Sequence, residues 1–308
     1  MGLDEIPLQA HFLSLAEGRR LAWYEFGDAR GTPCIYVTGT PTSGIAGAFY
    51  HRAACDAGVR WIALDKPGYG QSDAQPGRSL LDWAEDVFAL ADHLQIGRFA
   101  VAGESGGGPR ALALCHALPE RITVALLLAG VGPMENPAAL RGMHRANRMM
   151  FWLARHAPVL LHGALLLIRR GALRPQLRDD RRSHDKPSKQ LTAMPAADRV
   201  LYEQPQVRSL LKRAGAEALR QGVAPAVEDV VLLSRPWGFT LESIGVPVHL
   251  WQGSADRSVP PAMAQAMAST LPRSTLHLVE GAGHLVSFGV QVEIMGLIRQ
   301  AAGAKEQG

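Results

Sequence analysis

Short β-rich runs and helical stretches alternate through the first 130 residues of this 308-residue chain. The runs that predict strands are Arg20–Glu25, Cys34–Thr38, Arg60–Leu64, Arg98–Ala102 and Thr123–Leu128. Between the later runs, Ser79–Leu94 repeats apolar residues at helical spacing. Strands that alternate with helices indicate right-handed βαβ crossovers, so the sequence predicts an α/β fold built on a mainly parallel sheet.

The alternation stops after Gly130 and returns near the end of the chain. From Met134 to Phe239 the pattern is helical only and is interrupted by prolines. Strand patterns resume at Val246–Trp251 and Thr275–Val279. This organisation predicts one sheet domain, formed by residues 1–133 and 241–308, with a helical insertion at 134–240.

Composition narrows the class of protein. Hydrophobic residues make up 47% and charged residues 19% of the chain, as in ordinary globular proteins. The first ten residues carry two acids and no apolar signal segment, and the longest apolar run, Ala157–Ile168, is too short to span a bilayer. We therefore expect a cytoplasmic protein with no membrane span, whose three cysteines are structural thiols in a reducing compartment.

Charge is distributed unevenly along the chain. Residues 134–240 hold 18 Lys/Arg against 9 Asp/Glu, whereas the whole chain has a net charge of +4. The basic region lacks interleaved aromatic residues and nucleic-acid motifs, so no nucleic-acid partner is expected. A solvated helical face is the expected meaning of this charge, and attraction to an anionic substrate or surface is the alternative.

A serine stands where a predicted strand turns sharply into a helix. The strand Phe99–Ala102 runs directly into Gly103-Glu104-Ser105-Gly106-Gly107, which a helix pattern over Arg110–Ala117 follows. Such a turn strains the backbone of the serine and requires small neighbours, which Gly103 and Gly107 provide. The alternative is a glycine-rich turn without chemistry. The strand–turn–helix context favours Ser105 as a nucleophile.

A nucleophilic serine needs a base and a group that orients the base. Asp256 and His284 each follow a predicted strand directly, at Val248–Trp251 and Leu276–Val279. Catalytic groups of open α/β sheets gather at the carboxyl ends of the strands, and the chain order Ser, Asp, His is the one expected for such a fold. Glu135 and Asp65 are rival acids, of which Asp65 is expected to organise its own loop.

Acyl transfer also requires donors directed at the oxyanion. The backbone N–H of Gly106 is one candidate, and the N–H of Thr40, in the glycine-rich loop after Cys34–Thr38, is the other, with the Thr40 hydroxyl as an additional donor. The remaining predicted contacts are with substrate. They are Gly39 and Glu104 beside the nucleophile, and the apolar side chains Met149, Trp152 and Trp237.

With these residues in place, the chain resembles the α/β-hydrolase superfamily over essentially its whole length. The matching landmarks are the turn at Ser105 and the segments Pro67–Ser72, Gly253–Asp256 and Gly281–His284. The resemblance implies an eight-stranded sheet with the helical insertion as a cap over the pocket, and it is strongest to the capped esterase, epoxide-hydrolase and haloperoxidase-like branch. Two departures stand out. Ser105 replaces the aspartate of epoxide hydrolases and haloalkane dehalogenases, and Thr38 replaces the histidine that begins many oxyanion loops.

The resulting expectation is a serine hydrolase that cleaves an ester or related acyl bond of a small-to-medium, fairly apolar molecule through an acyl-enzyme. Neither a metal nor an organic cofactor is needed for that chemistry, and the expected partner is the small-molecule substrate, with a homodimer left open. Three alternatives remain. The same triad serves carbon–carbon bond hydrolases, lactonases and thioesterases. A non-hydrolytic relative, such as a lyase or a cofactor-free oxygenase, keeps the fold, and a catalytically silent shell keeps only ligand binding.

Overall fold

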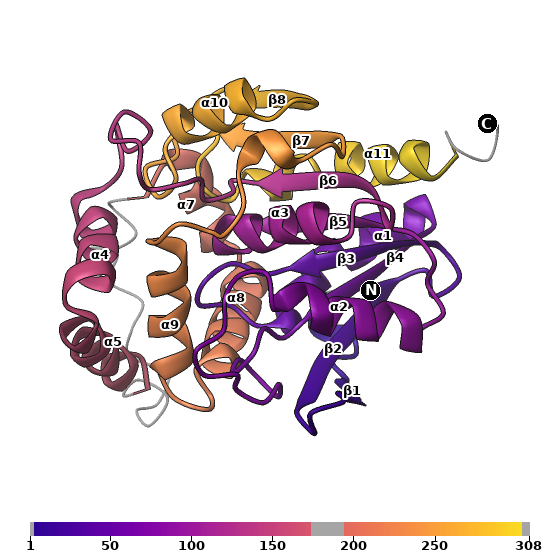
Figure 1. The fold of residues 1–308 in the computed structure, drawn as a ribbon, viewed down its shortest axis with the longest axis horizontal. Coiled ribbons are helices and arrows are strands. Elements are labelled where there is room, and N and C mark those ends of the chain that lie inside the picture. Colours follow the sequence, from indigo (N-terminus) through magenta and orange to yellow (C-terminus); the bar gives the residue numbers. More distant parts are fainter. Residues whose placement is uncertain (1–2, 174–193, 304–308) are drawn as a thin grey trace.

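The computed structural model describes residues 3–173 and 194–303. Its centre is an eight-stranded sheet with the order β1-β2-β4-β3-β5-β6-β7-β8 (Figure 1). The strands are β1 His11–Ser14, β2 Arg20–Gly27, β3 Thr32–Val37, β4 Val59–Leu64, β5 Phe99–Glu104, β6 Ile122–Leu128, β7 Val248–Gly253 and β8 Ser274–Val279. β2 runs antiparallel to β1 and β4, and every pairing from β4 to β8 is parallel. The predicted α/β-hydrolase fold with its mostly parallel eight-stranded sheet is confirmed.

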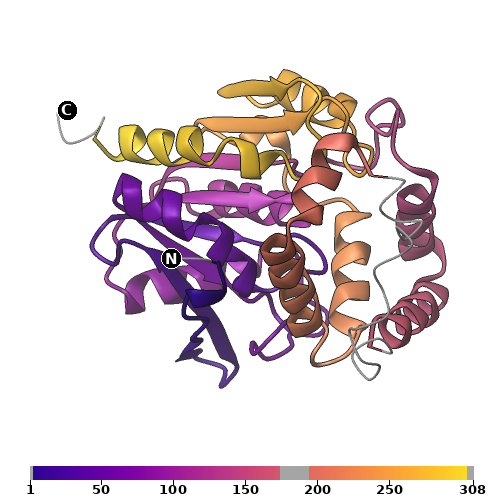
Figure 2. The ribbon, with the colours of Figure 1, turned by 180° about the vertical axis from the view of Figure 1, so that it is seen from behind.

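Helices cover both faces of the sheet. α2 (Trp83–His93), α3 (Gly108–Ala117) and α10 (Pro261–Thr270) pack on one face (Figure 1). α1 (His51–Ala57) and α11 (Gln291–Gly303) pack on the other (Figure 2). The central strands are therefore buried on both sides, which explains why β3 to β6 are almost continuously apolar in sequence. Two large buried clusters, one on each face, form the core.

The segment between β6 and β7 is helical. Its described helices are α4 Arg145–His156, α5 Pro158–Leu173, α7 Ala196–Glu203, α8 Pro205–Ala218 and α9 Ala224–Leu233. Residues 174–193 of the predicted insertion lie outside the described residues, and the boundaries of the insertion stay a prediction. The carboxyl ends of the parallel strands face α7, α8 and α9 (Figure 1). No helix among the described residues combines the length and apolar character that crossing a bilayer would take.

A buried ion cluster joins α9 to the sheet domain. Asp229 of α9 is fully buried, and its carboxylate lies 2.5 Å from Arg110 of α3, 2.8 Å from Arg78 and 3.2 Å from Lys66. These three cations are themselves almost fully buried. Glu228, beside Asp229, forms a further ion pair with Arg78 from a partly exposed position.

Opposite charges decide the ionisation of this cluster. Burial alone would raise the pKa of Asp229, but the cations of Arg110, Lys66 and Arg78 hold it well below its usual range. Burial lowers the pKa of Lys66 to about 8, although Asp229 acts in the opposite direction. The carboxylate of Asp229 therefore compensates for the cost of burying three cations.

Replacing Asp229 should destabilise the fold strongly. Asp229→Ala leaves three cations without their shared carboxylate, so we expect the free energy of unfolding to fall by about 3–5 kcal/mol. Glu228→Ala, the matched control, removes a partly exposed carboxylate and should cost about 1 kcal/mol or less. Urea titration followed by circular dichroism measures both. Similar losses for the two variants would contradict a central role for Asp229.

Candidate active site

Ser105 lies at the end of β5 and opens a single helical turn, η3 (Ser105–Gly107), that leads into α3. Its φ is +50°, in the left-handed region that residues with a side chain rarely adopt. A Cβ on Gly107 would collide with the carbonyl oxygen of Val37, and one on Gly103 would lie 2.7 Å from the carbonyl oxygen of Gly107. The two glycines predicted to make room for the turn are therefore required there, and the backbone of the turn at Ser105 is strained.

The three side chains predicted as a triad come together from three strand ends. The Nε2 atom of His284 lies 3.0 Å from the Oγ atom of Ser105. The Nδ1 atom of the same ring lies 2.8 Å from Oδ2 of Asp256. Asp256 follows β7 and His284 follows β8, so the parallel sheet brings residues 179 positions apart to one edge. The arrangement forms a continuous path for a proton from the serine to the imidazole.

Asp256 is fixed by its own loop. Its Oδ1 atom accepts the backbone N–H groups of Ser258 and Val259, and its Oδ2 atom accepts the side-chain amide of Gln252 as well as His284. Of the rival acids, Asp65 instead accepts the N–H groups of Gly44 and Gln71, as expected for a residue that organises its loop. Burial raises the pKa of Asp65 to about 6.

Three carboxylates set the charge state of His284. Burial alone would lower the pKa of the imidazole, but Asp256 outweighs it, and Glu104 and Asp198 act in the same direction as Asp256. Together they raise the pKa of His284 to about 9. The site therefore favours the imidazolium, which is the form that His284 would take after it removes a proton from Ser105.

Asp198 is a site residue that the sequence analysis missed. It lies on α7, and its two carboxylate oxygens accept the backbone N–H groups of His284, at 2.8 Å, and Leu285, at 3.0 Å. A Cβ on Gly283 would overlap this carboxylate, so the glycine is needed for the close approach. Burial raises the pKa of Asp198, and the two N–H groups counteract it. No pattern distinguishes Asp198 from the many other charges of the helical segment.

The predicted oxyanion loop lies against the nucleophile. A Cβ on Gly39 would lie 3.1 Å from Cβ of Ser105, and one on Gly106 would lie 2.7 Å from the hydroxyl of Thr40. The Lys66 ammonium donates to the carbonyl oxygens of Thr38, at 3.2 Å, and Gly39, at 2.6 Å. Because N–H and C=O point in opposite directions across a trans peptide, the N–H of Thr40 is turned away from Lys66.

Side chains hold this loop in shape. The hydroxyl of Thr38 donates to the carbonyl oxygen of Thr42 at 2.8 Å, so this threonine braces the loop where many relatives are expected to carry histidine. The hydroxyl of Thr40 donates to Asp229 at 2.9 Å and accepts from Lys66 at 3.1 Å. It is thus already engaged as a donor. The backbone N–H groups of Thr40 and Gly106 remain the candidate oxyanion donors.

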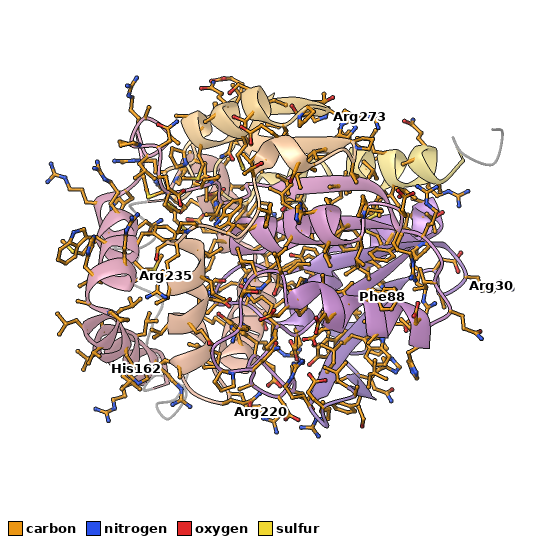
Figure 3. All side chains as sticks on the ribbon, in the orientation of Figure 1. Arg30, Phe88, His162, Arg220, Arg235 and Arg273 are labelled. Atoms are coloured by element: carbon orange, nitrogen blue, oxygen red, sulfur yellow. The ribbon has the colours of Figure 1, made fainter. Side chains whose placement is uncertain are left out.

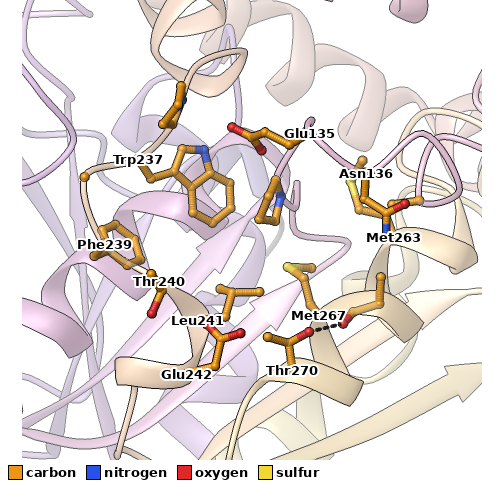
Figure 4. A pocket seen from close by; sticks show the side chains of 15 residues that line it. Glu135, Asn136, Trp237, Phe239, Thr240, Leu241, Glu242, Met263, Met267 and Thr270 are labelled. Carbon is orange, nitrogen blue, oxygen red and sulfur yellow. Dashed lines mark hydrogen bonds between the residues drawn. The ribbon is translucent and has the colours of Figure 1, made fainter.

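The other predicted substrate residues are Glu104, Met149, Trp152 and Trp237. Glu104 directly precedes Ser105, and its carboxylate accepts the hydroxyls of Tyr36 and, at 3.0 Å, Ser287. Met149 and Trp152 line a cavity of about 510 Å³ in the helical segment. Trp237 lines another cavity of about 530 Å³, together with Glu135, the other rival acid (Figure 4). Neither cavity is lined by a residue of the triad.

The described residues hold no group of three or more His, Cys, Asp or Glu side chains that could bind a metal ion.

Solved structures with the same fold include esterases. The chain is 24% identical to an alpha/beta hydrolase fold protein from Nakamurella multipartita, with a TM-score of 0.68 over 96% of this chain and 100% of that one. A thermophilic esterase from Thermogutta terrifontis is 22% identical, with a TM-score of 0.65 over 95% of this chain and 97% of that one. At these identities the likeness concerns the fold.

The proteins that this chain resembles in sequence are named for different activities. The chain is 34% identical over 57% of its length to the dihydrolipoyllysine-residue acetyltransferase component of the acetoin cleaving system of Pseudomonas putida, but spans only 42% of that protein. It is 29% identical to a non-heme chloroperoxidase of Streptomyces lividans over 46% of this chain and 56% of that one. The chain thus spans about half or less of these two relatives. The magnesium-chelatase 30 kDa subunit of Rhodobacter capsulatus is 27% identical over 91% of this chain and 92% of that protein.

The alpha/beta hydrolase family model matches residues 35–291, which include the serine turn, the helical segment and the loops of Asp256 and His284. With the sheet order and the strained serine turn, this match makes the chain a member of the alpha/beta hydrolase family.

Proposed function

We propose that this protein is a serine hydrolase that cleaves a carboxylic ester or a related acyl bond through an acyl-enzyme. The observation that carries the proposal is the pair of contacts made by His284, 3.0 Å to Ser105 and 2.8 Å to Asp256. A serine hydroxyl becomes nucleophilic when a base within hydrogen-bonding distance can take its proton. The fold of solved esterases supports this reaction class.

In the first step His284 takes the proton of Ser105 while Oγ attacks the acyl carbon, and Asp256 holds the imidazolium. The N–H groups of Gly106 and Thr40 stabilise the tetrahedral oxyanion. His284 then protonates the leaving alcohol, and the carbon–oxygen bond of the ester breaks to leave an acyl-serine. In the second step His284 activates water, which releases the acid and restores Ser105.

We propose that the helical segment, residues 134–240, acts as a cap that selects the substrate. Its α7 and α9 contact the two loops that carry the chemistry, through Asp198 at the His284 loop and through Asp229 at Thr40. A small-to-medium, fairly apolar acyl or alcohol group suits a pocket closed by such helices. Efficient cleavage of long-chain triglycerides, with no cleavage of short esters, would contradict this substrate class.

Ser105→Ala should abolish turnover of an activated ester such as p-nitrophenyl acetate, with a loss of roughly 10⁴-fold or more in kcat. The same change should prevent labelling by a fluorophosphonate, which reacts with an activated serine. Ser258→Ala is the matched control, because Asp256 uses only the backbone N–H of Ser258. Retained turnover or labelling in Ser105→Ala would overturn the proposed nucleophile.

The activity should rise with pH across an unusually alkaline range. His284 acts as a base only when it is neutral, and its pKa is raised to about 9 by carboxylates that outweigh burial. The neutral fraction, and with it kcat/KM, should therefore be small at pH 7, reach half its maximum near pH 9 and level off above that. A pH–rate profile with a substrate that does not titrate in this range measures the inflection. An inflection near the ordinary histidine value would contradict the raised pKa.

Asp198→Asn should change the pH profile as well as the rate. The amide is neutral, so the pKa of His284 should fall and the inflection should move to lower pH. One of the two N–H groups now held by Asp198 also loses its acceptor, so kcat should fall. Glu203→Gln, an exposed change on the same helix, should alter neither quantity. A lower kcat with an unmoved inflection would reduce Asp198 to a purely structural residue.

A further inference from the structure

The outer edge of the helical segment carries apolar side chains that face solvent. α4 and α5 lie side by side on the far side of α9 from the sheet (Figures 1 and 2). The large hydrophobic side chains that they expose are Met149, Trp152, Val159, Leu160 and Leu167. Single exposed apolar residues are common, but several of them on two adjacent helices point to a contact surface.

Arginines lie among these apolar residues. One face of α4 gathers six residues that follow one another at helical spacing: Arg145, Arg148, Met149, Trp152, Arg155 and His156. All six line the cavity of about 510 Å³, whose lining includes no acidic residue. The opposite face of α4 buries Ala154 against α9. One face of α4 therefore packs on α9, while its outward face combines cations with Met and Trp.

The charge of this edge is not balanced within its own helices. α4 and α5 together contain five arginines and no Asp or Glu. Within the described part of the chain, the ion pairs involve none of Arg145, Arg148 and Arg155. Some arginines of the sheet domain have acidic partners, as Arg60 has Glu25 and Arg121 has Asp92, whereas Arg98 and Arg273 donate to backbone carbonyl oxygens.

We propose that the outward face of α4 and α5 docks on an anionic membrane surface. Helices that lie in the interface of a bilayer combine arginines with exposed Trp and long apolar side chains, since the cations meet lipid phosphates while the apolar groups enter the acyl boundary. Trp is well suited to the headgroup level. Anionic headgroups supply the negative charge that α4 and α5 lack.

Trp152 provides a direct readout of docking. The chain has six tryptophans, and the other five, at positions 23, 61, 83, 237 and 251, are each less than 10% exposed, whereas Trp152 is 55% exposed. In the free protein, acrylamide should quench the part of the emission that Trp152→Phe removes. Vesicles made of equal parts phosphatidylglycerol and phosphatidylcholine should shift that emission to the blue, and vesicles of phosphatidylcholine alone should not.

Co-sedimentation with the same two kinds of vesicle measures affinity. The triple variant Arg145→Gln, Arg148→Gln, Arg155→Gln should bind the anionic vesicles about tenfold or more weakly than the wild type. Added salt at high concentration should likewise weaken the binding of the wild-type protein to these vesicles. Met149→Ser with Trp152→Ser should also weaken binding. The matched control is Phe88→Ser with Arg30→Gln, which alters an exposed aromatic and an exposed arginine far from α4 and α5 (Figure 3). This control should bind like the wild type.

Several results would overturn the proposal. Equal binding to both kinds of vesicle, or equal losses in the α4 variants and in the control, would show that the face does not recognise an anionic bilayer. Trp152 emission that is already blue and unquenched in the free protein would show that other parts of the protein cover the face. A dimer that Trp152→Ser dissociates, seen by light scattering, would make a second copy the partner. The proposal stands apart from the hydrolase proposal, since Ser105→Ala should leave vesicle binding unchanged.

Discussion

The arrangement of the site depends on the buried ion cluster around the carboxylate of Asp229. This carboxylate is shared by Lys66, Arg78 and Arg110, so a movement of α9 away from the sheet domain would leave three buried cations without a counter-charge. The same cluster shapes the oxyanion loop. Lys66 holds the carbonyl oxygens of Thr38 and Gly39, and Asp229 accepts the hydroxyl of Thr40, 189 positions earlier in the chain. The direction of a backbone N–H beside Ser105 thus depends on a helix that lies far away in sequence.

A second contact joins the helical segment to the loop that carries His284. Asp198 of α7 accepts two N–H groups of the loop that carries His284. The charges around Asp229 and around His284 are opposite in sign, and this difference suits the proposed reaction. Three cations surround Asp229 next to the loop where an oxyanion would form, and three carboxylates raise the pKa of the imidazole that would become cationic. Charges fixed in advance near the positions where opposite charge develops are the main source of stabilisation in such sites.

The sequence predicted those parts of the fold and site that depend on local pattern. Seven of the eight strands and the turn at Ser105 follow from apolar runs and glycine spacing. β1 was missed because His11–Ser14 is short and mostly exposed at the sheet edge. Asp198, Asp229 and Lys66 were missed as site residues because a charged residue is usually solvated and nothing local marks the few that are buried. That Met149, Trp152 and Trp237 contact substrate stays a prediction; these side chains line cavities that include no triad residue, and sequence pattern does not specify which cavity a side chain lines.

In the folded protein, the uneven charge of the chain is also separated in space. The cations that surround Asp229 all belong to the sheet domain, so the helical segment contributes a buried carboxylate there and none of the cations. Three of its own arginines lie on α4, which stands beyond α9 from the sheet (Figure 1). Residues 134–240 carry an excess of nine positive charges within a chain of net charge +4, so the remainder is net negative. The five arginines of α4 and α5, two helices without Asp or Glu, would meet an anionic surface first, because long-range attraction acts on them and repulsion acts on the net negative remainder.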